Sequence, residues 1–353
     1  MRTVLVTGGC GFIGSNFIRY ILERHPDWSA INLDKLTYAG NLANLNGLEG
    51  NKRYRFIRGD IADRELVEGL FQRDGIDVAV SFAAETHVDR SILDPSPFIE
   101  TNIKGTQVLL DAARRHDVER FIQISTDEVY GSTEEGRFTE DSPLQPNSPY
   151  AASKAAAELL CRASHKAYGV PVIVTRSSNN YGPYQFPEKL IPLMIRNALA
   201  EMPLPIYGEG KQVRDWLYVE DNCRAIDLVL KKGRAGRVYN IGGGCEKENI
   251  QVVDSICQIL AAKLEKNPEE FRRLITSIKD PRGEAHDFRY ALNCNRIREE
   301  MGWKPQVEFE EALGRTVQWY LENQDWVKGV VTGEYLEYYE RVYGQAVKEE
   351  VRR

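Results

Sequence analysis

The chain has 353 residues, of which 42% are hydrophobic and 28% charged, and this size predicts about two domains with sizeable cores. The net charge of −6, without a basic stripe, argues against a nucleic-acid-binding protein, and six scattered cysteines without a CxxC pair argue against a disulfide or zinc framework and favour a reduced, cytoplasmic setting. No run approaches the length of a membrane span and strand-like residues directly follow Met1-Arg2, so we expect neither a membrane partner nor a signal peptide.

The first predicted unit is a strand, a glycine turn and a helix. Residues 3–7 form the predicted strand, Gly8, Gly11 and Gly14 follow, and residues 15–24 carry apolar side chains at helical spacing. This context turns a glycine motif into a dinucleotide-binding fingerprint, because glycines let the backbone approach a pyrophosphate at a helix N-terminus. The spacing is GxxGxxG rather than GxGxxG.

The second predicted strand ends at Asp34, about 20 residues after Gly14, where an acid hydrogen-bonds the adenosine ribose hydroxyls. Because a carboxylate repels a 2′-phosphate, Asp34 favours NAD over NADP. A plain turn at the end of a strand is the other interpretation of this residue.

Strand and helix patterns continue to alternate after Asp34. Two further predicted strands end near Asp60-Ile61 and Ala83-Ala84. The first pair could flank the adenine and the second could let the cofactor pass close, although small residues at a strand end also serve plain packing. The repeated β-α-β order predicts an α/β fold with a Rossmann-type, doubly wound parallel sheet.

Two adjacent carboxylates, Asp127 and Glu128, follow a predicted buried strand at residues 120–125. In an open α/β sheet, ligands bind at the carboxyl ends of the strands. Adjacent acids in such a place often form only a turn or a helix cap. Because a cofactor site is predicted in the same half of the chain, we interpret Glu128 as a candidate base and Asp127 as a candidate acid.

A helix is predicted over residues 150–168, and it carries Tyr150 and Lys154 on one face. Such pairs are common on helices that have no catalytic role. A lysine ammonium beside the phenol would lower the pKa of Tyr150, and a tyrosine with a lowered pKa can act as a general base at neutral pH.

The chain resembles the extended short-chain dehydrogenase/reductase family. The resemblance rests on the run 7–14 and on the pair Tyr150 and Lys154, and it covers the chain to about Trp326. It narrows to the dTDP-glucose 4,6-dehydratases, within the NAD-dependent epimerase/dehydratase group, on residues 34–42, 84–91, 125–131 and 179–185. Asp127 is the most specific residue, because related epimerases typically lack the Asp-Glu pair and related decarboxylases and GDP-mannose dehydratases usually carry Thr-Ser-Glu here.

This resemblance implies a hydro-lyase that keeps NAD tightly bound and converts dTDP-glucose to its 4-keto-6-deoxy product and water. Tyr150, with Lys154, would take the proton of the C4 hydroxyl, and Thr126 would hydrogen-bond at the C4 oxygen. Glu128 would remove the C5 proton, and Asp127 would protonate the departing C6 hydroxyl. The implied cofactor contacts are Gly8, Gly11, Phe12, Ile13, Gly14, Asp34, Lys35, Thr37, Asp60, Ile61, Ala83, Ala84, Tyr150, Lys154 and Asn180.

The second half of the chain is predicted to hold the nucleotide sugar. Arg214 could pair with phosphate oxygens and Tyr207 could pack on a pyrimidine, although a solvated arginine and a core tyrosine are the plain alternatives. The run Asp280–Tyr290 departs from the Asp-Arg-Pro-Gly-His-Asp that is usual in the family. The implied substrate contacts are Thr86, Asn179, Lys189, Leu190, Pro205, Ile206, Tyr207, Arg214, Asn249, Arg282 and His286.

Domain boundaries are expected to interleave. We predict that residues 214–219 and 238–242 return to the main sheet. The expected parts are a NAD-binding Rossmann domain over 1–178 with return segments about 214–242, a smaller mixed α/β substrate-binding domain over 179–213 and 243–326, and a C-terminal tail over 327–353.

Three rival functions stay open at this point. The substrate of a UDP-sugar 4,6-dehydratase differs by a methyl and a hydroxyl group, and one methyl group in an apolar pocket is worth only about 1–3 kcal/mol. A C4 epimerase or decarboxylase would not need Asp127, and a non-catalytic NAD-binding regulator would not need Tyr150 and Lys154. The resemblance also implies a homodimer through helices at 97–115 and 150–168, whose apolar residues include Val108, Leu109, Leu159 and Leu160.

Overall fold

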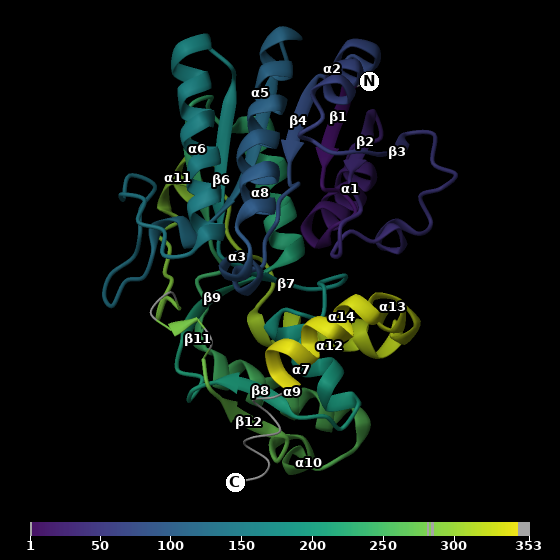
Figure 1. The fold of residues 1–353 in the computed structure, drawn as a ribbon, viewed down its shortest axis with the longest axis vertical. Coiled ribbons are helices and arrows are strands. Elements are labelled where there is room, and N and C mark those ends of the chain that lie inside the picture. Colours follow the sequence, from purple (N-terminus) through teal and green to yellow (C-terminus); the bar gives the residue numbers. More distant parts are fainter. Residues whose placement is uncertain (1, 281, 284–285, 345–353) are drawn as a thin grey trace.

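The computed structural model describes residues 2–280, 282–283 and 286–344. Its main sheet has seven parallel strands in the order β10-β6-β5-β4-β1-β2-β3, which confirms the predicted doubly wound fold (Figure 1). The strand order reverses at β1, and such a switch point is where open α/β sheets bind ligands. The strands are β1 (Arg2–Thr7), β2 (Trp28–Asp34), β3 (Tyr54–Arg58), β4 (Val78–Ser81), β5 (Arg120–Thr126), β6 (Val172–Ser177) and β10 (Val238–Ile241).

Helices cover both faces of this sheet, as the side chains of β1 illustrate. Val4 and Val6 pack into one hydrophobic cluster with α1 and α8, while Leu5 packs into another with α2, α5 and α6. A strand buried on both faces is expected to carry a continuous apolar run, and in β1 this run is Val4-Leu5-Val6. The helices and short turns of this part are α1 (Phe12–Arg24), η1 (Leu42–Leu45), α2 (Arg64–Asp74), α3 (Val88–Leu93), α4 (Ser96–Phe98), η2 (Ile99–Gly105), α5 (Thr106–Arg115), η3 (Asp127–Tyr130), α6 (Pro149–Tyr168) and α8 (Val219–Lys232).

The second part of the molecule lies beyond the carboxyl ends of the main strands (Figure 1). It contains a three-stranded sheet, β11-β9-β7, and a parallel pair, β12-β8. Its elements are β7 (Asn179–Tyr181), α7 (Leu190–Leu199), β8 (Leu204–Tyr207), β9 (Val213–Tyr218), β11 (Glu246–Glu248), α9 (Asn249–Leu264), α10 (Pro268–Arg272), β12 (Ile275–Ile278), α12 (Phe309–Glu322), α13 (Gln324–Val330), α14 (Gly333–Tyr339) and η5 (Glu340–Gly344). Helix α11 (Asn295–Met301) instead packs against β10 and α8 beside the main sheet (Figure 1).

One predicted return to the main sheet is wrong. Strand β9 pairs with β7 and β11, and only β10 joins the large sheet. The reason is that β10 occupies the edge beside β6, with Val238 opposite Val174. The chain of β6 instead continues into β7, and β9 aligns there, with Trp216 opposite Asn179.

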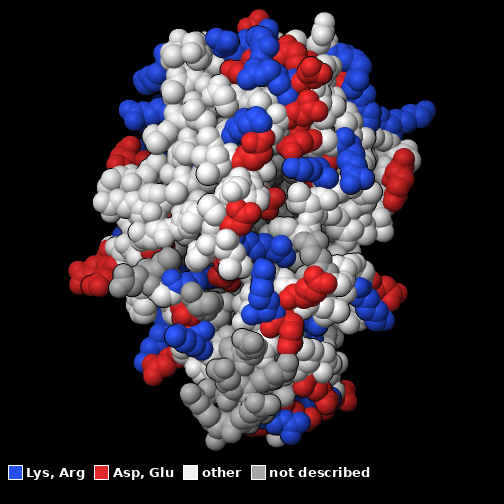
Figure 2. Space-filling view, in the orientation of Figure 1, with Lys and Arg blue, Asp and Glu red and all other residues white. Residues whose placement is uncertain are grey.

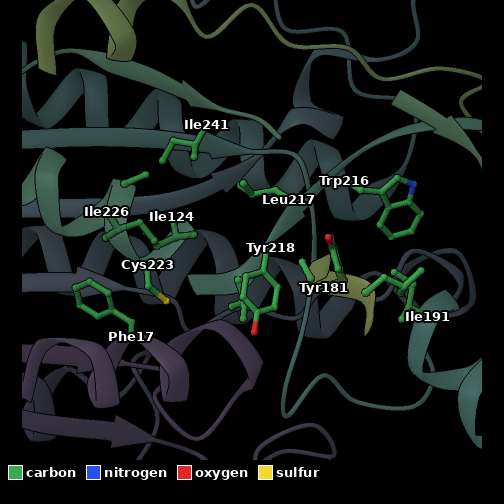
Figure 3. Close-up of a cluster of buried hydrophobic side chains, with 14 of the residues drawn as sticks. Phe17, Ile124, Tyr181, Ile191, Trp216, Leu217, Tyr218, Cys223, Ile226 and Ile241 are labelled. Atoms are coloured by element: carbon green, nitrogen blue, oxygen red, sulfur yellow. The ribbon is translucent and has the colours of Figure 1, made fainter. Parts of the chain in front are cut away.

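A single hydrophobic cluster joins the two parts (Figure 3). Phe17 and Ile241 contribute from the main sheet and its helices, and Trp216 and Ile191 contribute from the smaller part. The two parts therefore share one hydrophobic core.

Acidic and basic side chains are interspersed over the face shown in Figure 2. Within the described ranges, no helix combines the length and the apolar character that crossing a membrane requires. Residues 345–353 of the predicted tail lie outside the described residues.

Candidate active site

The glycine turn after β1 brings bare backbone against the strand end of β4. Gly8 has a φ of 70°, and a Cβ there would lie 2.6 Å from the Ala83 nitrogen. A Cβ on Gly14 would lie 2.4 Å from the Gly8 oxygen. Helix α1 begins at Phe12, and its N-cap Gly11 makes no side-chain capping bond. The first helical N–H groups are therefore available to an anion such as a pyrophosphate.

Asp34 closes the end of β2. Its two carboxylate oxygens accept hydrogen bonds from the backbone N–H groups of Cys10 and Leu36, both at 2.8 Å. Burial raises the pKa of Asp34, and these two bonds oppose that rise. Each oxygen retains a second lone pair for a ribose hydroxyl, so the residue is more than a turn former.

All fifteen predicted cofactor contacts line one cavity at the switch point of the sheet. Thr86, a predicted substrate contact, lines it as well, and so do the catalytic candidates Thr126, Asp127 and Glu128. At the adenosine end, the Lys35 ammonium lies 2.6 Å from an Asp60 carboxylate oxygen. Sequence reasoning missed further lining residues, which lie in the last residues of a strand or in the loop that follows it and could have been found by extending each strand: Leu33, Ala39, Gly40, Gly59, Phe82, Glu85, Ile124, Ser125, Ser177, Ser178, Gln185, Phe186 and Glu188.

The two candidate acids occupy a single helical turn, η3, directly after β5. Thr126 starts this turn, with its hydroxyl accepting the Glu128 N–H at 3.2 Å and donating to Asp127 at 3.2 Å. The other Asp127 oxygen, Oδ2, is buried and has no hydrogen-bond partner among the described residues. Such an unpartnered buried oxygen calls for a proton or a ligand group.

Burial raises the pKa of Asp127 well above its usual range, and the carboxylates of Glu128 and Asp215 add to the rise. Burial also raises the pKa of Glu128, but Arg282, Lys189 and Arg214 oppose that shift. The environments of the two acids therefore differ: that of Asp127 favours the protonated form, and Glu128 faces cations that favour the carboxylate. Such a split of pKa values marks acid and base roles.

One electrostatic prediction about Tyr150 is wrong. Burial raises the pKa of Tyr150, the Glu128 carboxylate raises it further, and a hydrogen bond with Thr126 opposes the rise. Lys154 donates to the Ile124 carbonyl at 2.6 Å, and burial lowers its pKa to about 8. Desolvation of the phenolate thus outweighs the expected help from the ammonium. Sequence spacing indicated the shared helical face correctly but carried no information on burial.

The π-helical segment η2 fixes the loop after β4 to helix α6. Its Asn102 accepts the Glu85 N–H at 2.9 Å, donates to the Glu85 carbonyl at 3.0 Å, and donates to Ser153 at 2.8 Å. Ser153 directly precedes Lys154. This side chain, which the sequence analysis did not single out, therefore holds the cavity wall at Thr86 beside the catalytic helix.

A second cavity adjoins the first and contains every predicted substrate contact except Thr86. Asn179, Asn180, Lys189 and Glu128 line both cavities. Further lining residues were not predicted as substrate contacts: His87, Val88, Ile191, Leu193, Met194, Trp216, Tyr290 and Tyr343. His87 and Val88 belong to the run 84–91 and Tyr290 to the run 280–290, so these runs could have indicated them.

The two arginines of this second cavity are held by other parts of the chain. Arg214 is buried and donates to the carbonyls of Val213, Asp287 and Phe288, at 2.8, 2.8 and 3.1 Å, so it is not a solvated surface residue. Arg282 forms an ion pair with Asp89 through its Nε, which leaves its two terminal nitrogens outside that pair.

His286 forms a close pair with Asp280. Burial lowers the pKa of His286, and Arg282 lowers it further. In the run Asp280–Tyr290, which differs from the motif usual in the family, residues 281, 284 and 285 lie outside the described residues.

The residues around the first cavity fit a dinucleotide. The bare backbone at Gly8 and Gly14 leaves no room for a Cβ, and Asp34 offers acceptors at the ribose position. Several buried polar oxygens in the two cavities have no hydrogen-bond partner among the described residues, so a bound ligand could pair with them. They are Ser125 Oγ, Asp127 Oδ2, Asn179 Oδ1, Asn180 Oδ1, Gln185 Oε1 and Asn249 Oδ1.

The family model described as GDP-mannose 4,6 dehydratase matches residues 5–316 of this chain. The chain belongs to this dehydratase family. A dTDP-glucose 4,6-dehydratase of Xanthomonas campestris pv. campestris (strain B100) is 52% identical over 348 residues, covering 95% of this chain and 97% of the relative. A dTDP-glucose 4,6-dehydratase of Haemophilus influenzae is 52% identical, covering 92% of this chain and 99% of its own.

Solved structures give the same relationship. DesIV of Streptomyces venezuelae, a dTDP-glucose 4,6-dehydratase with NAD and TYD bound, has a TM-score of 0.87 and 48% identity over 93% of this chain and 99% of its own. A UDP-glucose 4-epimerase of Thermotoga maritima, with UDP-glucose, has a TM-score of 0.81 and 29% identity over 91% of this chain and 99% of its own. The fold is thus common to dehydratases and epimerases, and side chains of the site must separate the two activities.

Proposed function

We propose that this chain is an NAD-dependent dTDP-glucose 4,6-dehydratase, a hydro-lyase that converts dTDP-glucose to dTDP-4-keto-6-deoxyglucose and water. The observation that carries the proposal is the Asp127-Glu128 pair at the junction of the two cavities. Asp127 is buried and its pKa is raised, so it can hold a proton to give. A C4 epimerase breaks no C–O bond and expels no water, so it needs no such acid. The similarity of about half of all positions to named dTDP-glucose dehydratases supports the same choice.

The first proton transfer belongs to Tyr150. We assign to it the C4 hydroxyl proton, with Thr126, its hydrogen-bond partner, at the C4 oxygen. To accept this proton Tyr150 must be a phenolate, a form that burial disfavours in the chain alone, and the positively charged nicotinamide of NAD, when bound, would favour it. NAD, when bound, supplies the group that accepts a hydride from C4 and returns it to C6.

The elimination belongs to the two acids. A ketone at C4 acidifies the C5 proton, which Glu128 takes as general base. Asp127 then donates its proton to the C6 hydroxyl, and water departs. Glu128 returns a proton to C5. The proton that Tyr150 took from the C4 hydroxyl is released to solvent and Asp127 regains one from solvent, so the chain ends each turnover with the protons it began with. Both acids line the first cavity, and Glu128 lines the second as well, so the two side chains can reach the same sugar.

Substrate binding is assigned to the second cavity. Arg214 and Arg282 provide guanidinium groups for the diphosphate, and Tyr207 lies beside Pro205 and Ile206 as a platform for the base. The proposed choice of thymidine over uridine rests on similarity to named relatives, since a methyl group alone gives about 1–3 kcal/mol of discrimination.

The test is product analysis with a panel of nucleotide sugars. Incubation of the purified protein with dTDP-glucose in deuterated water should give a 4-keto-6-deoxy product with one deuterium at C5, measured by mass spectrometry and NMR. UDP-glucose should react more slowly. A product epimerised at C4 with its C6 hydroxyl intact would instead support the epimerase.

We also propose a homodimer and a cytoplasmic location. Leu159 on α6 is 55% exposed, and Ile99 on η2, which is 56% exposed, lines a hollow together with Val108 and Leu160. Leu109, by contrast, is fully buried in the core of its own chain and does not contribute to that surface. Large exposed side chains grouped in this way favour a protein partner. A monomer by light scattering at micromolar concentration would refute the dimer, and cell fractionation tests the location.

A further inference from the structure

Helix α14 lies next to two loops that line the cofactor cavity. The first loop, residues 35–40, follows β2, and the second, residues 182–189, follows β7. Neither loop contains a helix or a strand. Each loop makes backbone turns of its own, such as Gly40 N–H to the Thr37 carbonyl, and side-chain contacts from other parts of the chain help to fix its position.

One of these contacts is a cation between two aromatic rings. The guanidinium carbon of Arg90 lies 3.8 Å from the ring centre of Tyr38, in the first loop, and 4.5 Å from the ring centre of Tyr338, on α14. The Arg90 side chain is mostly removed from solvent, and Tyr338 is 4% exposed. Cation–π attraction is stronger when the charge is desolvated in this way.

The second loop is tied to the same cluster. The Tyr38 hydroxyl donates to Glu188 at 3.1 Å, and Arg90 Nε lies 3.6 Å from the other Glu188 oxygen. On α14, the Tyr335 hydroxyl donates to the Pro187 carbonyl at 3.0 Å, and its ring contacts that of Phe186 edge-on at 5.8 Å. Phe186 and Glu188 both line the cofactor cavity.

We propose that Arg90 is a positioning residue for bound NAD, and that helix α14, acting through Tyr338, holds both loops against the cofactor and slows its release. The inference rests on the proposed function in one respect, that NAD occupies the first cavity. It assigns a role in cofactor binding to helix α14, on which none of the predicted site residues lies. Retention suits a reaction that restores the cofactor in each turnover.

The test measures cofactor exchange, not turnover. Wild-type protein and the variants Tyr338→Leu, Tyr338→Phe and Arg90→Gln are purified without added nucleotide, and exchange of the bound cofactor for isotope-labelled NAD is followed. Tyr338→Leu and Arg90→Gln should exchange about tenfold faster than wild type. Tyr338→Phe should stay near wild type, because the ring rather than the hydroxyl faces Arg90. Leu336→Ala, an exposed position on the same helix, is the matched control and should not change.

Several outcomes would overturn the proposal. Wild-type exchange in folded Tyr338→Leu or Arg90→Gln protein would do so, as would equally fast exchange in Tyr338→Phe and Tyr338→Leu. If Tyr338→Leu does not fold, Arg90→Gln decides alone. Wild-type protein without any bound NAD(H) would overturn the cofactor assignment itself, a result distinct from fast exchange in the variants.

Discussion

The two cavities are built in different ways. At its glycine turn the cofactor cavity is walled by backbone: Gly8 and Gly14 present no side chain, and Asp34 is oriented by two backbone N–H groups. In the substrate cavity, side chains hold one another, as Arg282 and Asp89 do, although 193 residues separate them. We conclude that the first site should be sensitive to added atoms, and the second to altered side chains.

The largest effect is expected at the junction of the two cavities. Asp127→Asn has no proton to give, so turnover should fall about 10²–10⁴-fold. Oxidation at C4 depends on Tyr150 and Lys154, so a single turnover of Asp127→Asn should still show the absorbance of reduced nicotinamide. Tyr150→Phe should show little, and Glu128→Gln should block deuterium entry at C5. If Asp127→Asn lost the absorbance as completely as Tyr150→Phe, the assignment of Asp127 as the C6 acid would be wrong.

Lys154 offers a test by pH. Its folded pKa of about 8 lies below the 10.5 of an ordinary lysine, so the unfolded chain binds the proton more tightly between these values. The buried ammonium therefore destabilises the fold below pH 8, and the penalty disappears as pH rises through 10.5.

The free energy of unfolding of Lys154→Met, measured relative to wild type, should therefore be about 3 kcal/mol more favourable at pH 7 than at pH 10.5. Part of the gain at pH 7 is offset by about 1 kcal/mol, because the Ile124 carbonyl loses its donor. Urea unfolding at both pH values measures the difference. A stability difference between variant and wild type that does not depend on pH would contradict it.

Gly8→Ala tests the backbone-built cavity. An alanine at this positive φ costs about 1–2 kcal/mol, and its Cβ would also collide with the Ala83 backbone, adding about 1–3 kcal/mol. Protein purified from this variant should release little NAD(H) on denaturation. Gly47→Ala is the matched control, because Gly47 has a φ of 90° with nothing within 4 Å of an added Cβ. Equal loss of stability in both variants would mean that strain, not close approach, decides.

Arg214→Lys tests the cavity built from side chains and should have the smallest effect. A lysine cannot span the carbonyls of Val213, Asp287 and Phe288, so the wall of the cavity should loosen. We expect the KM for the nucleotide sugar to rise about tenfold, equivalent to about 1.4 kcal/mol, with bound NAD(H) unchanged. Arg272→Lys, at a partly exposed pair with Asp254, is the control. Loss of bound cofactor in Arg214→Lys would remove the distinction between the cavities.

The elements that the sequence predicted correctly are those governed by local patterns. Strand β1, the turn at Gly8 and helix α1 follow from hydrophobic periodicity and glycine spacing within the first 24 residues. The position of Asp34 follows from the length of that same unit. Parallel strands then bring their carboxyl ends to one edge, so the order of strands and helices was enough to place Asp127 and Glu128 near the cofactor.

Tertiary structure alone decided three features. Strand β9 lies outside the main sheet because β10 occupies the edge next to β6, a competition that no local pattern reveals. The pKa of Tyr150 is raised because desolvation outweighs the nearby charges, and burial is set by the whole fold. The contact of Tyr338 with Arg90 joins residues that are far apart in the chain, where spacing in the sequence carries no signal. The sequence determined which groups the sites contain, and long-range packing decided their protonation and their partners, because both depend on atoms that only the folded chain brings together.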